Sequence, residues 1–180
     1  HAEAFMAEPD PAQAIDVLFC GSYGYHSDWP YRPKLIDWLR ETYGDRFRLT
    51  PNNKPAVRGR ALNVLYASAK VIVGDSLVPH FTHKCYTSDR LPETLGRGGF
   101  LVYPRISGIT DGGMVTEGEH VACYSFGDFR ELRDKIDHYL ENAEEREAIR
   151  KAGHKHAVAT MTYRHRMTEM LAKVAEMGAA

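Results

Sequence analysis

The segment from Tyr86 to Glu93 gathers residue types that suit a phosphate beside a ribose. A helix that begins near Asp89 would present unpaired backbone N–H groups and a partial positive charge, and both favour a phosphate. Ser88 or Asp89 is placed to cap this helix, and Arg90 adds a cation in its first turn. Glu93 follows one turn later, where its carboxylate can accept hydrogen bonds from a ribose diol. The segment is therefore predicted to bind a nucleotide, with the Tyr86 ring beside it.

The same residues also have a purely structural interpretation, which composition alone favours. Asp89 would cap the helix and Gly96 would end it. Arg90 and Glu93 would form a surface ion pair at i,i+3 spacing, and Tyr86 would pack within its own loop. The two interpretations differ in whether Arg90 and Glu93 face a ligand or each other.

Two other loops follow predicted strands and contain glycine, namely residues 21–24 and residues 74–76. In open parallel sheets, ligands bind beyond the carboxyl ends of the strands, and glycine lets the backbone approach a ligand closely. Gly21, Ser22 and Asp75 are therefore candidate ligand-binding residues. A plain turn at residues 21–24 explains the first loop equally well, because the full GxGxxG pattern is absent.

Other motifs that could carry chemistry are weak or missing. The loop from Ser107 to Gly118 could wrap a ligand with exposed amides, although composition favours a flexible surface loop. His80 and His83, and likewise the pair at 154 and 156, lack an acidic or cysteine neighbour at a metal-ligand spacing, so no metal site is predicted. A nucleophile elbow and a phosphate-binding P-loop are both absent.

Strand-like and helix-like segments alternate along the chain, as expected for a doubly wound α/β fold with a parallel sheet. Short apolar runs predict strands at Ile15–Cys20, Phe47–Thr50, Lys70–Gly74, Gly99–Tyr103 and His120–Tyr124. Amphipathic spacing predicts helices from about Pro33, at Ala61–Ala69, at Asp89–Leu95, after a capping box at Asp128 and Glu131, at Ala143–Thr160, and after a cap at Thr162. The carboxyl end of the chain is therefore expected to be helical.

The composition indicates a single domain of 180 residues with 43% hydrophobic residues and a formal net charge of -1. This charge gives no reason to expect nucleic acid as a partner, and no apolar run approaches the roughly 20 residues that span a bilayer. The three cysteines are dispersed, which fits a reducing compartment and a cytoplasmic location. Residues 1–14 are predicted to be a linker or the edge of an excised piece, and residues 15–177 the domain.

The order of several segments resembles the C-terminal domain of group 1 glycosyltransferases, in the branch that includes spore-maturation-type glycosyltransferases. The segments that carry this resemblance are Leu62–Ser76, Ser88–Val102, Glu117–His120, Phe129–Leu132, Ile136–Leu140, Arg146–Ile149, Ala152–His154 and Thr162–Arg166. The resemblance implies the GT-B architecture, in which two Rossmann-like domains enclose the active site. The C-terminal domain of such enzymes binds the nucleoside diphosphate sugar and the N-terminal domain binds most of the acceptor.

The resemblance assigns roles to particular residues. It implies that Glu93 binds the donor ribose and that Arg90, with the helix start at Ser88 and Asp89, faces the diphosphate. It also implies a transfer reaction without a metal or other cofactor, and an acceptor-binding N-terminal domain that is missing from this chain. Many group 1 enzymes have a second glutamate eight residues before the first, where this chain has Cys85.

Two alternatives stay open at this point. The chain could be a nucleotide-binding module without catalysis, or another Rossmann-like enzyme of sugar nucleotides such as an epimerase or a dehydrogenase. Tyr66 and Lys70 stand at the Tyr-x-x-x-Lys spacing of some of those enzymes. Because Lys70 is predicted to open a strand, the pair would straddle a helix end, and we interpret the match as chance.

Overall fold

A computed structural model of the chain describes residues 7–24, 30–50, 57–76 and 86–178. Its centre is a five-stranded sheet in the order β2-β1-β3-β4-β5, and every pair of neighbouring strands is parallel. The strands are β1 (Ile15–Phe19), β2 (Phe47–Leu49), β3 (Ala69–Val73), β4 (Leu101–Pro104) and β5 (Ala122–Tyr124). The predicted parallel α/β sheet is confirmed.

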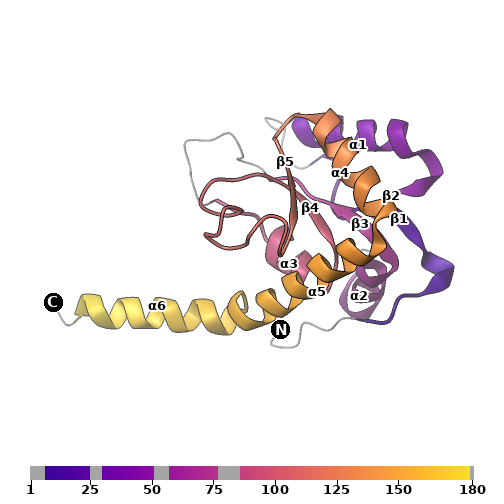
Figure 1. Cartoon of the computed structure of the whole chain (residues 1–180). Coiled ribbons are helices and arrows are strands. Elements are labelled where there is room, and N and C mark those ends of the chain that lie inside the picture. The colour runs from indigo at the N-terminus through magenta and orange to yellow at the C-terminus, as the bar shows by residue number, and fades with distance from the viewer. Residues whose placement is uncertain (1–6, 25–29, 51–56, 77–85, 179–180) are drawn as a thin grey trace.

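Helices cover both faces of the sheet (Figure 1). Two of them, α1 (Tyr31–Tyr43) and α4 (Phe129–Glu141), lie over one face. Over the other face lie α2 (Gly59–Ser68), α3 (Arg90–Gly96) and α5 (Ala143–Thr160). The fold is therefore doubly wound, as the alternation of strands and helices predicts.

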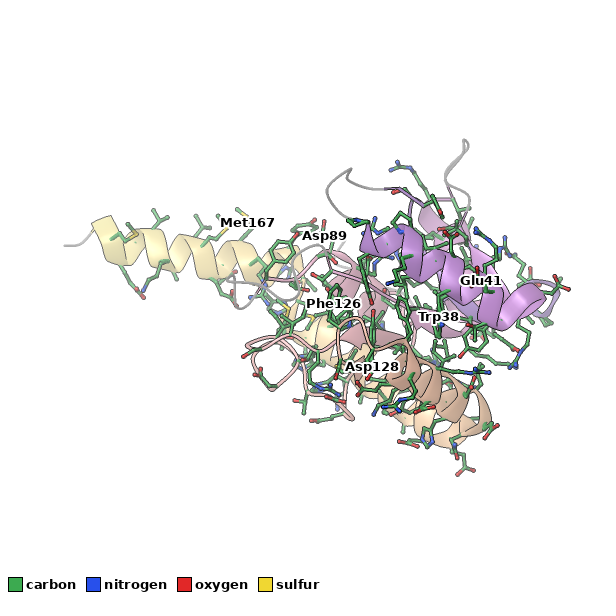
Figure 2. The ribbon with its side chains drawn as sticks, turned by 90° about the horizontal axis from the view of Figure 1, so that it is seen from above. Trp38, Glu41, Asp89, Phe126, Asp128 and Met167 are labelled. Carbon is green, nitrogen blue, oxygen red and sulfur yellow. The ribbon has the colours of Figure 1, made fainter. Side chains whose placement is uncertain are left out.

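The apolar runs of the strands are continuous because both faces of the sheet are buried. Val71 and Val73 of β3 pack in the core beneath α1 and α4, whereas Ile72 packs in the core on the opposite face. All three side chains are fully buried. On the first face, Trp38 of α1 stacks on Phe129 of α4 at a centroid distance of 4.9 Å, which joins the two helices. Figure 2 labels Trp38 on α1.

The predicted capping box at the start of α4 is only half formed. The Asp128 carboxylate accepts hydrogen bonds from the N–H groups of Arg130 and Glu131, as a helix cap should. The Glu131 carboxylate accepts instead from the Ser125 N–H at 2.6 Å and from Arg105. The prediction was wrong for Glu131 because the strand end before the helix and a nearby guanidinium both compete for its carboxylate.

The loop between β4 and β5 is folded upon itself and does not offer its amides to a ligand. Its N–H groups donate within the loop, for example from Val115 to the Ile109 carbonyl at 2.8 Å and from Glu117 to the Thr110 carbonyl at 3.0 Å. The side chains of Ile109 and Val115 are buried in the core. The ligand-wrapping interpretation is wrong, because these amides are used within the loop. Residues 111–113 are exposed, as expected for a surface loop, although the loop is anchored in the core.

The last turn of this loop depends on a neutral histidine. His120 stacks on His156 of α5 at a centroid distance of 4.1 Å, and its Nδ1 accepts a hydrogen bond from the Thr116 N–H. Its Nε2 lies 3.5 Å from a carboxylate oxygen of Glu119. Burial, followed by the neighbouring His156, lowers the pKa of the His120 imidazole below its ordinary value of 6.5.

We expect the stability of the domain to fall in mild acid through His120. Because the pKa is lower in the folded chain, the unfolded chain binds more protons in this range, so the stabilisation is complete above the ordinary pKa and is lost as pH falls. The free energy of unfolding should therefore decrease between about pH 7.5 and 5.5, with a shallower slope in His120→Asn. Equal slopes for the two proteins in urea titrations would contradict this role.

The last helix, α6 (Tyr163–Gly178), extends away from the rest of the domain (Figure 1). Thr162 caps it as predicted, because its hydroxyl accepts a hydrogen bond from the His165 N–H. The side chains of Met167, Met170 and Leu171 are more than half exposed, and Figure 2 places Met167 well away from α1 and α4. The apolar side of α6 therefore does not pack on the described part of this domain.

Among the described helices, none has the length and apolar character to cross a bilayer.

Candidate functional site

The strand order reverses between β1 and β3. The chain passes from β1 outward to β2 and then returns to β3, from which it continues in the opposite direction to β4. Ligands of doubly wound sheets bind at such a reversal, beyond the carboxyl ends of the strands. The two predicted loops, residues 21–24 and 74–76, follow these two strands and so meet at one site.

Arg90 lies across the ends of both strands. Its Nη1 donates a hydrogen bond to the Cys20 carbonyl, and its guanidinium carbon lies 4.6 Å from the centroid of the Phe19 ring. Its Nε lies 3.6 Å from Oδ1 of Asp75, and only 11% of the side chain is exposed. The interpretation of Arg90 as a surface partner of Glu93 is therefore wrong.

The glycines at this edge make room for Arg90. Gly21 has a φ of +148°, and a Cβ there would lie 2.9 Å from Nη2 of Arg90. A Cβ on Gly74 would lie 2.8 Å from Cδ of Arg90 and equally close to the ring of Tyr103. The group that closely approaches the Gly21 backbone is thus an arginine of this chain, and the approach of a ligand there stays a prediction.

Asp75 is buried and is held by Arg32 of α1. Nε and Nη2 of Arg32 donate to the two carboxylate oxygens at 2.8 and 3.1 Å, and the Asp75 side chain has no exposed surface. In this arrangement Asp75 contacts arginines and is closed off from solvent. Sequence reasoning missed Arg32, because nothing near residue 32 signals a partner 43 residues away.

The beginning of α3 differs from the prediction. Asp89 has helical backbone angles and its side chain makes no capping hydrogen bond. The residue is exposed (Figure 2). The Ser88 hydroxyl lies 3.3 Å from the Tyr103 hydroxyl and does not cap the helix either. Both capping predictions were wrong. Ser22 and Tyr86 are half-buried at the same edge of the sheet.

Glu93 lies one turn along α3 and is accessible. Its side chain is 41% exposed, and it accepts hydrogen bonds from Nε and Nη2 of Arg97 at 3.1 and 2.9 Å. Gly98, with a φ of +75°, ends the helix in a Schellman arrangement, where Gly96 was expected. A ligand could reach Glu93 by replacing an exposed ion pair, which contributes little to stability.

The ends of β1 and β3 suit anion binding better than nucleophilic chemistry. Burial raises the pKa of the Cys20 thiol to about 11, so the thiolate that could act as a nucleophile is scarce near neutral pH. His154 and His156 lie near two different carbonyl groups, those of Leu95 and Met114. The described residues contain no group of three side chains that could hold a metal ion, while His80, His83 and Cys85 lie outside the described residues.

The sequence matches the glycosyl transferase-like family over residues 14–172. The chain belongs to this family. The resemblance found in the sequence is therefore confirmed at the family level. The Tyr66 and Lys70 pair gives no support to another Rossmann-like enzyme, because Lys70 lies in β3 and pairs with Asp16. No curated protein matches the sequence.

Solved structures of glycosyltransferase-like proteins share the fold. The sucrose-phosphate synthase of Thermosynechococcus elongatus has a TM-score of 0.63 and 16% identity, covering 90% of this chain and 38% of its own. HepE of Anabaena, solved with UDP and glucose, has a TM-score of 0.62 and 14% identity, covering 95% of this chain and 55% of its own. This chain therefore spans about half the length of these structures or less, and the match confirms its Rossmann-like GT-B fold.

Proposed function

We propose that this glycosyltransferase-like domain binds a nucleoside diphosphate sugar at the carboxyl ends of β1 and β3. The observation that carries the proposal is the placement of two side chains on α3: Arg90 lies at the ends of these strands, and an accessible Glu93 follows one turn later. A cation suits the diphosphate, and a carboxylate suits the ribose hydroxyls. The structure of HepE with UDP-glucose, which shares this fold, supports the choice of ligand class.

The remaining candidate residues take supporting roles in this proposal. Gly21 leaves room for a ligand beside Arg90, while its own N–H donates to the Thr50 hydroxyl. Ser22 follows it in the same loop, and Asp75 holds the two arginines. Ser88 and Asp89 lie where the chain enters α3, and Tyr86 lies just before them. We assign charge stabilisation of the departing nucleoside diphosphate to Arg90, so that transfer proceeds without a metal ion.

The acceptor site is proposed to come mostly from an N-terminal companion half. The chain spans 38 to 55% of the length of the similar structures, which leaves room for a second domain in a longer protein. The exposed apolar side of α6 offers a surface on which this half could pack. The residues of that surface are Tyr163, Met167, Met170, Leu171, Val174 and Met177.

Replacing Glu93 with alanine should weaken the binding of uridine diphosphate by about 1–3 kcal/mol, the range for losing a charge-assisted hydrogen bond. Isothermal titration calorimetry measures this change directly. Glu169→Ala is a matched control. Like Glu93, Glu169 forms an exposed ion pair with an arginine nearby in the chain, but this pair lies on α6. The control should bind like the unmodified chain.

Two results would contradict these assignments. Unchanged affinity in a folded Glu93→Ala protein would remove the ribose role from Glu93. If the unmodified chain binds none of a panel of nucleoside diphosphates and their sugars, the proposed function itself is wrong. Circular dichroism on each variant shows whether the fold is retained.

A further inference from the structure

Arg32, Asp75 and Arg90 form one connected cluster at the carboxyl ends of β1 and β3. Arg32 enters from α1 on one face of the sheet and Arg90 from α3 on the other. Both guanidinium groups lie near the Phe19 ring, at 5.9 and 4.6 Å from its centroid. The carboxylate of Asp75 lies between them, so the cluster joins the two helical layers at the edge where a ligand would bind.

The Asp75 carboxylate is committed mainly to Arg32. Arg32 contacts both carboxylate oxygens at 2.8 and 3.1 Å, in the two-pronged geometry that fixes the orientation of both groups. Arg90 Nε lies at 3.6 Å, within reach of the charge but beyond hydrogen-bond distance. The carboxylate therefore attracts Arg90 without satisfying its donors.

Arg90 has donors that the described residues leave unused. Its Nε is fully buried and has no hydrogen-bond partner, which is costly for a charged group. Its Nη2 also makes no hydrogen bond to the described residues, and it lies 2.9 Å from the place where a Cβ of Gly21 would be. An unsatisfied guanidinium beside a glycine is suited to receive an anionic oxygen.

We propose that Arg32 and Asp75 are positioning residues that hold Arg90 ready for a pyrophosphate group beside Gly21. Arg32 fixes the Asp75 carboxylate from α1, and Asp75 holds the charge of Arg90 at the strand ends. The incoming anion supplies the acceptor that Nη2 of Arg90 lacks, while the buried Nε stays beside Asp75. This inference rests on the proposed function for the identity of the ligand, but the anion site is testable without a nucleotide.

The proposal predicts that lysine cannot replace Arg32. A lysine keeps the positive charge but cannot contact both carboxylate oxygens in a fixed plane, so Asp75 and then Arg90 would lose their orientation. Inorganic pyrophosphate should therefore bind Arg32→Lys about tenfold more weakly than the unmodified chain. Arg90→Lys should weaken binding at least as much, and it provides a second test should Arg32→Lys fail to fold.

Arg46→Lys is the matched control, because Arg46 also pairs with an aspartate, Asp16, but with 56% of its side chain exposed. Titration calorimetry at constant ionic strength should give the same pyrophosphate affinity for this control as for the unmodified chain. Equal affinity in folded Arg32→Lys, or no pyrophosphate binding by the unmodified chain, would overturn the inference. Pyrophosphate binding that depends on Arg32, together with no binding of any nucleotide, would support the anion site and contradict the proposed function.

Discussion

Replacing Asp75 with alanine should lower the free energy of unfolding by about 3–5 kcal/mol, the range for removing one partner of a buried ion pair. The carboxylate has no exposed surface and accepts two hydrogen bonds from Arg32. Arg90 lies 3.6 Å from the same carboxylate, and its side chain is only 11% exposed. Alanine would leave two guanidinium groups in the protein interior without their carboxylate partner. Water could not fully replace that partner, because the site is buried.

Asp16→Ala provides the control for this measurement. Asp16 also pairs with two cations, Arg46 and Lys70, each at 2.7 Å, but about half of each cationic side chain is exposed. Asp16→Ala should lower the free energy of unfolding by less than about 1 kcal/mol. Urea unfolding followed by circular dichroism compares the two variants, with equal m-values as the sign that both unfold in the same way. Equal losses of unfolding free energy in the two variants would show that burial of the Asp75 ion pair adds no stability.

Most of the fold could be predicted from the sequence, because burial on both faces of a parallel sheet leaves a direct mark. The runs at Ile15 and Val71 consist almost entirely of apolar residues, since each strand packs against helices on two sides. The limits of α5 at Ala143 and Thr160 match the prediction as well. These features depend on neighbouring residues, so a short stretch of sequence contains the information.

The site was predicted less well, because its contacts join residues far apart in the chain. Arg90 contacts the Cys20 carbonyl across 70 residues, and Arg32 contacts Asp75 across 43. Local reasoning paired Arg90 with Glu93, whereas the fold turns Arg90 inward and leaves Glu93 to Arg97. A buried aspartate after a strand signals that some cation must reach it. Which cation does so is set by the topology and not by spacing along the chain.

The same limit explains the loop between β4 and β5. Its glycines and polar residues read as a flexible segment, yet Ile109 and Val115 anchor it in the core. Gly113 is needed there for a close approach, since a Cβ would lie only 2.0 Å from the Gly108 carbonyl oxygen. Ile109 and Val115 are six positions apart, and the residues between them show neither helical spacing nor strand alternation of apolar side chains. The sequence pattern therefore does not reveal that both are buried.

The largest functional effect is expected from adding the proposed N-terminal companion half to this chain. Alone, the chain should bind nucleoside diphosphate sugars but transfer sugar at a negligible rate, because nothing orients an acceptor against the donor. A longer protein that carries both halves should transfer sugar over many turnovers, faster by at least on the order of 10²-fold, since orientation and the exclusion of water both depend on the second domain. The difference is measured by incubating each protein with a panel of nucleotide sugars and acceptors and following the amount of product over time.

Variants in the longer protein separate the possible outcomes of this experiment. Glu93→Ala should reduce transfer, while Glu169→Ala, an exposed ion-pair change on α6, should leave it intact unless the companion half packs at that residue. Multiple turnovers by the short chain alone would mean that one domain supplies both the donor and the acceptor sites. Nucleotide binding without transfer by the longer protein, across the whole panel, would favour the binding-module alternative. Transfer that requires both halves and Glu93 would assign this chain the donor side of a glycosyltransferase.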